Sequence, residues 1–477
     1  MKIFNLVNRV IVAIICFYII GCNIPANMQQ VKTRPMPIKF DNLTDSGSAA
    51  SIKWAQYFTD KNLVALIDTA IKNNLEVLIT LQEIEIAKNR VQAAKGRLIP
   101  SVSAGIGLGI EKVGLFTSQG AGDASADIIP GNKVPEILGD QKLSFQARWE
   151  VDVWGKLHNL KKAAFNRYLS SVEVKNYVIT NLVAEVANTY YELLALDNQL
   201  QIIKETIQLQ KNALKIVKVQ KEASVVSELA VKQFEAAVFN SQGFEFEIVQ
   251  KITEGENRMN FLLGRFPQTI ARDKSNFIEQ IPMLIKLGIP AELLAMRPDI
   301  KQAEFELAAA KCDVAAAKAE FYPSLGISSG IGFQAFKPSY LFNTPQSLAY
   351  SLLGEFAGPL VNRNAIKAEF KNANAYQVEA MYNYQKAILN GFVEVATELS
   401  NINNLDQFYK LKTKQVESLT KSIDISNDLF KSARATYLEV LMTQRDALEA
   451  KLELVDAKKR QFNAVTNIYK ALGGGWN

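Results

Sequence analysis

Long stretches without proline or glycine are the feature that most constrains this 477-residue chain. No proline lies between Pro135 and Pro267 or after Pro359, and the segment from Lys156 to Gln242 lacks glycine as well. Apolar residues recur there at spacings of three and four, which gives each segment an apolar stripe for a neighbouring helix. A helix rises ~1.5 Å per residue, so about 60 residues reach ~90 Å, comparable to the width of a periplasm. The pattern predicts very long helices rather than a series of compact domains.

The composition argues against several kinds of chemical site. The single histidine, His158, speaks against His-dependent catalysis and against multi-histidine metal sites. The three cysteines, Cys16, Cys22 and Cys312, are too few for a disulfide framework or a four-cysteine zinc site. The net charge of +6 is spread along the chain without a basic stripe, so we expect no nucleic-acid partner. We expect His158 on a helix surface and Cys312 as a small packing residue.

The first 21 residues have the pattern of a bacterial lipoprotein leader. Lys2 and Arg9 provide a basic region, Val10 to Ile20 is apolar, and Gly21 precedes Cys22. The apolar run of about 11 residues is shorter than the ~20 that a spanning helix needs. Cleavage would leave Cys22 as a lipid-bearing N-terminus anchored to a membrane. The alternative is an ordinary secretory leader followed by a chance cysteine.

A lipidated tether is predicted over residues 22–50, after the leader at 1–21. This stretch contains Pro25, Pro35 and Pro37 among polar residues, as in an extended linker. Asn23 follows the anchor, and the absence of aspartate at this position is associated with passage to the outer membrane. We therefore expect an outer-membrane lipoprotein whose only covalent group is the lipid on Cys22, without any other cofactor.

Four short segments alternate apolar and polar residues with the period of a β-strand. The alternation is complete from Ser144 to Trp154. Strands of ~9 to 11 residues that face lipid on one side and a watery lumen on the other build outer-membrane barrels. A half-buried sheet of a soluble protein is the alternative. The predicted strands lie at about 101–110, 144–154, 324–335 and 347–358.

Four strands are too few to close a barrel. Open sheet edges in lipid would leave backbone groups unpaired, at a cost of several kcal/mol each. Further copies of the chain must therefore supply the missing strands, and the same arrangement would cover the long helices. The sequence predicts a homo-oligomeric tube.

The chain also has the pattern of an internal duplication. Each half runs helix, strand, strand, long helix, helix. We place the first repeat at 51–265, a proline-rich linker at 266–300 and the second repeat at 301–477. The recurring motifs are Ala93-Ala94-Lys95 with Ala316-Ala317-Lys318, Glu185-Val186-Ala187 with Glu394-Val395-Ala396, and Leu263-Gly264 with Leu472-Gly473.

Several motifs together carry a specific resemblance to a known family. They are Ile289-Pro290-Ala291-Glu292-Leu293-Leu294, Arg297-Pro298-Asp299-Ile300, Phe321-Tyr322-Pro323-Ser324-Leu325, Trp149-Glu150-Val151-Asp152-Val153-Trp154-Gly155, Tyr437-Leu438-Glu439-Val440 and Tyr469-Lys470-Ala471-Leu472-Gly473-Gly474-Gly475-Trp476. With them, the chain from about Trp54 to Trp476 resembles the TolC-like outer-membrane efflux proteins, within the OprM/NodT-type lipoprotein branch. One departure is Val361-Asn362-Arg363-Asn364, where that branch commonly has Phe-Asp-Gly-Gly, which puts the local turn in question.

The resemblance implies an α+β membrane protein. Three chains would contribute four strands each to a twelve-stranded outer-membrane β-barrel, which a long periplasmic α-helical barrel would continue. The implied partners are two further copies of the chain, outer-membrane lipid, a periplasmic adaptor (membrane fusion) protein and an inner-membrane RND-type pump. The loops at 111–141 and 336–346 would lie outside the cell.

The resemblance also suggests a gate at the periplasmic tip, where an adaptor would dock. The turns near Ala223–Ser227 and Ser432–Thr436 would form this tip. An acidic ring lines the constriction of TolC-like channels, and by motif match Glu439 occupies one such position while Met442 occupies the other. Three converging Glu439 carboxylates would repel each other and attract cations. The alternative is an ordinary exposed helix carboxylate.

Two further charges, Asp428 and Arg434, are weaker gate candidates that surface charges explain as well. Asp299 is expected to stabilise the start of a helix after Pro298.

From these features we expect a passive trimeric duct that exports drugs or other small molecules and carries out no covalent chemistry. An exit duct for polypeptides, driven by an ATP-binding-cassette exporter in a type I system, would use the same tube. A non-conducting envelope scaffold is the third reading, and it would require the strands to form a soluble sheet.

Overall fold

The structure is a computed structural model that describes residues 37, 52–274, 277–279, 290–358, 363–432 and 434–476. The predicted leader, Cys22 and nearly all of the tether lie outside these residues, as do Val361 and Asn362 of the departing motif. Within the described ranges, no helix combines the length and the apolar character that crossing a membrane would require.

The described residues form two compact units. The first, here called the sheet unit, contains Ile86–Tyr168 and Phe305–Met381. The second, here called the helical unit, contains Leu169–Glu304, the described residues from 382 onward and those up to Glu85. Each unit therefore draws on both halves of the sequence, and the predicted repeat borders near 265 and 301 stay predictions.

The order and length of the elements confirm the internal duplication. The paired helices have 22 and 22, 67 and 68, and 35 and 35 residues. The first half runs α4 (Leu75–Gly96), β1 (Ser101–Glu111), β4 (Leu138–Val151), α6 (Lys156–Glu222) and α7 (Glu228–Leu262). The second half runs α9 (Pro298–Ala319), β5 (Ser324–Ala335), β6 (Leu348–Ala357), α10 (Asn364–Lys431) and α11 (Tyr437–Ala471).

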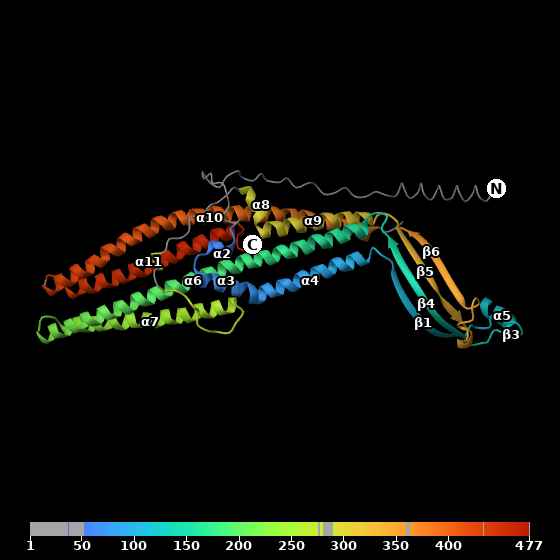
Figure 1. Ribbon diagram of the computed structural model, residues 1–477, viewed down its shortest axis with the longest axis horizontal. Helices are drawn as coiled ribbons and strands as arrows, with labels where there is room; N and C mark the ends of the chain where they lie inside the picture. The colour runs from blue at the N-terminus through green and yellow to red at the C-terminus, as the bar shows by residue number, and fades with distance from the viewer. Residues whose placement is uncertain are drawn as a thin grey trace. The chain divides into compact units, whose positions relative to one another are not determined.

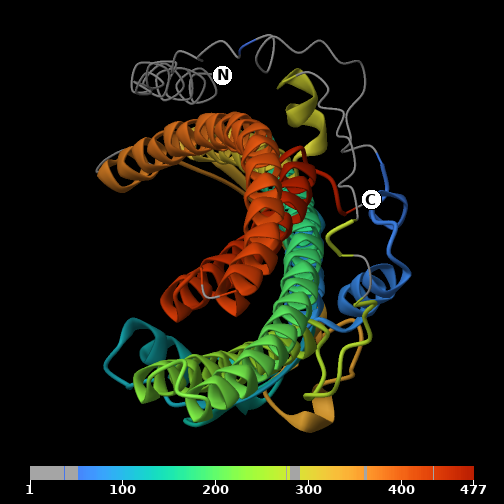
Figure 2. The ribbon, with the colours of Figure 1, turned by 90° about the vertical axis from the view of Figure 1, so that its left-hand side faces the viewer.

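The stretches without proline form the long helices that the sequence predicts. In the helical unit, α6 with α7 and α10 with α11 form two helical hairpins that lie side by side, as Figure 2 shows from the end of their turns. Residues 223–227 separate the first pair of helices and residues 432–436 the second. Ser224 in the first turn adopts the left-handed conformation, with φ of 58°, which reverses the chain direction.

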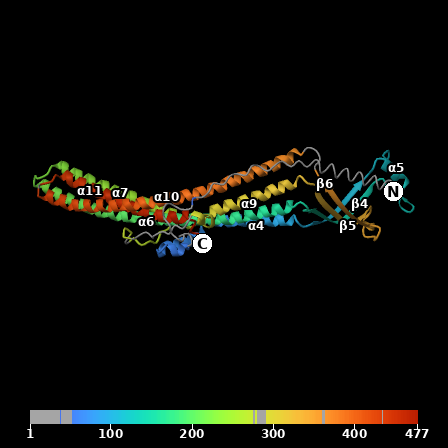
Figure 3. The ribbon, with the colours of Figure 1, turned by 90° about the horizontal axis from the view of Figure 1, so that it is seen from above.

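The sheet unit contains one four-stranded antiparallel sheet in the order β1-β4-β5-β6 (Figures 1 and 3). Its strands lie at the four predicted segments, but β4 ends at Val151, three residues before the predicted Trp154, and begins at Leu138, six residues before the predicted Ser144. The reason is that residues 138–143 pair with Ile106–Glu111 of β1, although a glycine and polar residues obscure their strand pattern.

The segment between β1 and β4, expected as a plain loop, has structure of its own. It contains α5 (Ser118–Ser125) and a small hairpin of β2 (Asp127–Ile129) and β3 (Asn132–Lys133). The Thr117 side chain caps α5 by accepting a hydrogen bond from the Gly120 amide at 3.0 Å. Such a short capped helix carries too weak a pattern to be recognised within a glycine-rich sequence.

The core of the helical unit joins segments that are far apart in the chain. The helices α2 (Trp54–Tyr57) and α3 (Lys61–Asn73) pack onto α6 and α11. Tyr57 stacks on Tyr469 with ring centroids 3.9 Å apart, and its hydroxyl donates to the Val465 carbonyl at 2.8 Å. Tyr190 donates to the Asp60 carboxylate at 2.7 Å. Helix α2, near the described start of the chain, thus packs against α11, the last helix.

Arg297, just before α9, is a second fastening point. Its guanidinium donates to Asp299 at 2.7 Å, to Glu394 of α10 at 2.8 Å and to the Ala471 carbonyl at 2.6 Å. Asp299 lies in the first turn of α9, as expected from Pro298, and it also pairs with this arginine. The 3-10 helix η2 (Pro290–Glu292) and α8 (Leu293–Met296) precede this point.

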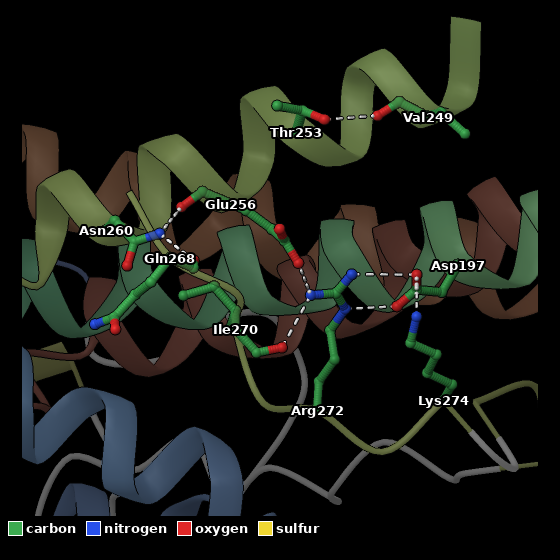
Figure 4. A network of polar contacts seen from close by, with 9 residues as sticks. All are labelled: Asp197, Val249, Thr253, Glu256, Asn260, Gln268, Ile270, Arg272 and Lys274. Carbon is green, nitrogen blue, oxygen red and sulfur yellow. Dashed lines mark hydrogen bonds and ion pairs between the residues drawn. The ribbon is translucent and has the colours of Figure 1, made fainter. Parts of the chain in front are cut away.

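The segment after α7 is held by a third network, which Figure 4 shows from close by. Arg272 lies between Asp197 of α6 and Glu256 of α7, with Nε 2.5 Å from Asp197 and Nη1 2.6 Å from Glu256. The side chains of Arg272 and Asp197 are each only 3% exposed, and Lys274 adds a third contact at 3.0 Å. Burial alone would lower the pKa of Arg272, but its hydrogen bonds to the two carboxylates raise it.

We expect Arg272→Ala to lower the free energy of unfolding by about 3–5 kcal/mol, because it leaves the buried Asp197 carboxylate without its main partner. Arg258→Ala is the matched control, since its pair with Glu185 at 2.9 Å is exposed and is expected to contribute less than about 1 kcal/mol. Thermal unfolding in detergent and amide hydrogen exchange of residues 266–274 would measure both. Equal effects of the two variants would contradict a structural role for the buried network.

Candidate functional site

The two helical turns of the helical unit are packed together by an apolar cluster. Val217 of α6 and Val231 and Phe234 of α7 contact Val440 of α11, and Phe430 of α10 packs against the same cluster. Phe234 is fully buried. The two hairpins of one chain therefore meet at the end where the sequence predicts a gate.

Glu439 lies at this end, but its carboxylate has a structural task. Thr436 and Glu439 form a capping box at the start of α11: the Thr436 amide donates to Glu439 Oε2 at 2.6 Å, and the Glu439 amide donates to Thr436 Oγ1 at 3.4 Å. The hydrogen bonds from the backbone and the hydroxyl of Thr436 lower the pKa of Glu439. The carboxylate is exposed and ionised, so capping and a ring of charge are compatible, and the gate role stays a prediction.

The other three gate candidates have different surroundings. Met442 is 45% exposed, one helical turn after Glu439. Asp428 is exposed and pairs with Lys431 at 3.3 Å, within α10. Arg434 lies in the turn, where its backbone amide donates to the Leu429 carbonyl at 2.8 Å. The contacts found among the described residues do not join these side chains to Glu439, and their gate roles stay predictions.

A groove of about 590 Å³ lies beside these residues, between α7 and α11. Gln210 of α6 is buried in its floor, and its side-chain oxygen has no hydrogen-bond partner among the described residues. Sequence reasoning missed this groove, because only the packing of the two hairpins brings its walls together. The walls include Asn240, Phe244, Leu438, Met442, Arg445 and Glu449.

In the sheet unit, the strand register gathers the apolar residues on one face. Directly paired residues of antiparallel strands point to the same side of the sheet. Ile106 pairs with Leu143, Leu143 with Phe333, and Phe333 with Leu348, which gives one apolar row across all strands. Ile106 and Leu348 of this row are exposed, Ile106 by 79%, and Leu143 and Phe333 are half-buried. The other large members of this apolar face are Val102, Leu108, Ile110, Phe145, Trp149, Val151, Leu325, Ile327, Ile331, Tyr350, Leu352 and Phe356.

The opposite face of the sheet, here called the polar face, is different in kind. β1 contributes only serine, glycine and Glu111 to it, and β5 contributes serine, glycine and Gln334. The long charged residues come mainly from β4. Leu138 and Leu353 are the large apolar members. The β4 residues on the polar face are Asp140, Lys142, Ser144, Gln146, Arg148 and Glu150.

Aromatic residues lie near both ends of the apolar face. At the helix end, Trp154 stacks on Tyr322 with centroids 4.7 Å apart and donates to the Pro323 carbonyl at 2.7 Å. At the loop end, Phe342 contacts Phe333 with centroids 5.5 Å apart. Apolar bands flanked by aromatic residues are typical of proteins that sit between lipid and water.

His158 lies on the surface at the start of α6, as expected. Its Nδ1 lies 2.5 Å from Asp152, and the same carboxylate accepts from the amides of Leu157 at 2.9 Å and His158 at 2.8 Å. Burial would raise the pKa of Asp152, but these hydrogen bonds lower it. His158 thus helps to fix an aspartate that caps the longest helix of the first half.

Cys312 is partly buried in α9, and burial raises the pKa of its thiol, which fits the expected packing role. The part of the chain that the structure describes holds no group of three or more histidine, cysteine or acidic residues able to bind a metal ion.

Comparison with known proteins gives a family match over most of the chain. The model of the family described as outer membrane efflux protein matches residues 66–265 and 289–474. These two segments contain all the long helices and all four strands of the sheet.

Two curated relatives show the range of the family. The pyoverdine export outer membrane protein OpmQ of Pseudomonas aeruginosa is 27% identical over 429 residues, which cover 89% of this chain and 87% of the relative. The cation efflux system protein CusC of Escherichia coli is 25% identical over 464 residues, 96% of each chain.

Among solved structures, the open state of the MtrE outer membrane channel of Neisseria gonorrhoeae is similar, with a TM-score of 0.82 at 20% identity. The match covers 95% of this chain and 98% of that one. The predicted TolC-like fold class and the resemblance on which it was based are confirmed.

We expect Ile106→Lys to prevent insertion into the outer membrane, because it places a charge in the middle of the apolar face. Lysine at the midplane of a barrel wall costs about 2–4 kcal/mol. Ser103→Lys is the matched control, since Ser103 lies on the same strand but on the polar face, and it should insert normally. Fractionation and heat-resistant migration in mild detergent would measure insertion. Equal insertion of both variants would contradict the assignment of the two faces.

Two substitutions of Glu439 separate capping from charge. Glu439→Gln keeps a capping-box side chain without the charge, whereas Glu439→Ala removes both. We expect Glu439→Ala to speed amide hydrogen exchange at residues 436–440, and Glu439→Gln to leave it nearly unchanged at neutral pH. Because the pKa of Glu439 is lowered, its contribution as a carboxylate is complete above the ordinary glutamate pKa and is lost as the pH falls through the lowered value.

If the charge of Glu439 has a gate role, Glu439→Gln should change the cation selectivity of the channel while amide hydrogen exchange at residues 436–440 stays unchanged. If Glu439→Gln conducts like the wild type, the residue is a cap alone and the constriction lies elsewhere.

Proposed function

Because the chain belongs to the outer membrane efflux protein family, we propose that it forms, as a trimer, the passive outer-membrane duct of a tripartite efflux system. The observation that carries the proposal is the sheet with one predominantly apolar face, one polar face and two open edges. Efflux and the outer membrane come from the family. The number of copies, the partners and the anchor are our inferences.

The open edges support the assembly of several copies. The edge strands β1 and β6 each pair with one neighbour in the sheet, and both are exposed along their whole length. In lipid, each unpaired backbone group costs several kcal/mol. Pairing β6 of one copy with β1 of the next would remove both edges. Three copies would place the apolar face toward lipid and the polar face toward an aqueous lumen.

The groove between α7 and α11 supports an adaptor as a partner. It joins apolar walls to a buried glutamine that lacks a hydrogen-bond partner among the described residues, and a docked helix of a periplasmic adaptor would cover both. An inner-membrane RND-type pump would supply the energy. The cargo does not follow from the fold, because the names of the relatives give pyoverdine for one and cations for another.

We further propose that the duct carries out no covalent chemistry and needs no cofactor. Cys22 would bear the lipid that anchors the mature N-terminus, as its leader pattern suggests. The single histidine, His158, contacts Asp152, which accepts hydrogen bonds from the first amides of α6. This arrangement is structural rather than catalytic.

Planar-bilayer recordings of the detergent-extracted protein test the duct. We expect discrete channel currents from a species of three times the mass of the chain, and loss of both currents and trimers in Ile106→Lys. Ser103→Lys should retain trimers and currents. Inserted wild-type protein that never conducts, even after the turns at 223–227 and 432–436 are loosened, would favour a scaffold instead.

A further inference from the structure

The polar face carries two cationic side chains on β4, the half-buried Lys142 and the exposed Arg148. The strand register places Lys142 beside Gly107 of β1 and Gln334 of β5, and Arg148 beside Ser101 of β1 and Ser328 of β5. Neither cation forms an ion pair with the described residues. Most of their neighbours on the adjoining strands are therefore too small to cover them.

The small residues beside β4 have two different causes. At Gly332, a Cβ atom would lie 2.1 Å from the Leu143 carbonyl oxygen, so the close approach of β5 to β4 requires glycine. At Gly105, a Cβ atom would meet nothing within 4 Å. Packing thus does not explain the lack of side chains on β1, and the space above that strand is open.

The two cations share a hollow of about 370 Å³ on this face. Hydroxyl and amide groups of Ser144, Gln146, Ser328 and Ser351 line it together with Lys142 and Arg148, and none of its lining residues is acidic. The hollow therefore offers two full positive charges and several hydrogen-bond donors within one cavity.

The carboxylates of the polar face lie toward the two ends of the sheet, outside the hollow. At the loop end are Glu111 and Asp140, and Asp140 accepts a hydrogen bond from Gln334 at 2.7 Å. At the helix end are Glu150, which pairs with Lys156 at 2.8 Å, and Glu355, and both line a neighbouring hollow together with Arg148. The middle of the face is thus cationic, with acidic residues on either side.

We propose that Lys142 and Arg148 form an oxyanion-binding station in the lumen, which receives carboxylate- or phosphate-bearing solutes as they pass the barrel. The inference rests on the proposed duct, because only an assembled barrel turns the polar face toward passing solutes. Arginine binds such groups through a planar fork of donors, and lysine binds them as a point charge. Serine hydroxyls beside both cations supply further donors.

The spacing of the two cations favours the passage of an anionic solute along the lumen over its tight binding at one place. Six residues of strand place their Cα atoms about 20 Å apart, so a small anion contacts one cation before the other. Conduction through a pore requires sites that bind the solute strongly enough for it to enter and weakly enough for it to leave. Two successive sites open to water meet that condition, and a trimer would repeat them around the lumen.

The station can be tested by blocking single-channel currents with inorganic pyrophosphate as the probe. We expect the concentration of pyrophosphate for half-block to rise by about tenfold or more in the double variant Lys142→Gln with Arg148→Gln, because charge-assisted hydrogen bonds are lost. Lys133→Gln is the control for the loss of a lysine charge outside the hollow: Lys133 lies on β3 in the loop, where it pairs with Asp127 at 3.0 Å. Pyrophosphate should block this variant at the same half-block concentration as the wild type.

Arg148→Lys, which keeps the charge and loses the fork, should weaken the block only in part. If the double variant does not insert, Lys142→Gln and Arg148→Gln are measured singly, and each is expected to weaken the block. Conducting channels with equal half-block in all variants would overturn the station and leave the duct intact. A wild type that inserts without conducting would overturn the duct itself.

Discussion

The pairing of β4 with β5 is the interaction on which the rest of the sheet depends. These strands come from different halves of the duplicated chain, and their register from Gln141 with Ala335 to Val151 with Leu325 joins both halves in one sheet. The side-chain period of a strand is two, so a slip by one residue would turn every apolar side chain of β5 to the polar face. One backbone ladder therefore decides which side of the sheet can meet lipid and which can meet water.

Outside the sheet, buried ion pairs hold the irregular segments together with apolar contacts such as those of Ile270 and Phe277. The prolines that separate the two halves prevent a continuous helix there, so these segments need other partners. Arg272 supplies them after α7, and Arg297 supplies them before α9. Both guanidinium groups are nearly fully buried and meet more than one acceptor, which a buried charge requires. Each network ties a loop to helices from a distant part of the sequence.

Much of this architecture could be predicted because its signals are local. The absence of proline and glycine marks α6 and α10, and period-two alternation marks β1 and β5 within a residue of their observed bounds. The start of β4 was missed because Gly139 and Asp140 break the alternation, and only the partner strand shows that residues 138–143 belong to the sheet. Local signals also fail for α2, a single turn whose Tyr57 contacts Tyr469 and Val465 near the other end of the chain.

The site residues also divide into those that a local motif identifies and those that only contacts between distant segments reveal. A motif could identify Glu439 as a residue of interest, but not that its carboxylate caps its own helix, because a capping box and a ring of charge place an acidic residue at the same position.

The groove between α7 and α11, and the hollow around Lys142 and Arg148, depend on which helices and strands are neighbours, and no single segment carries that information. A passive duct has no reacting atoms whose chemistry would demand particular residues. Its function lies in the distribution of charge and space along its walls, and that distribution follows from the strand register rather than from any one motif.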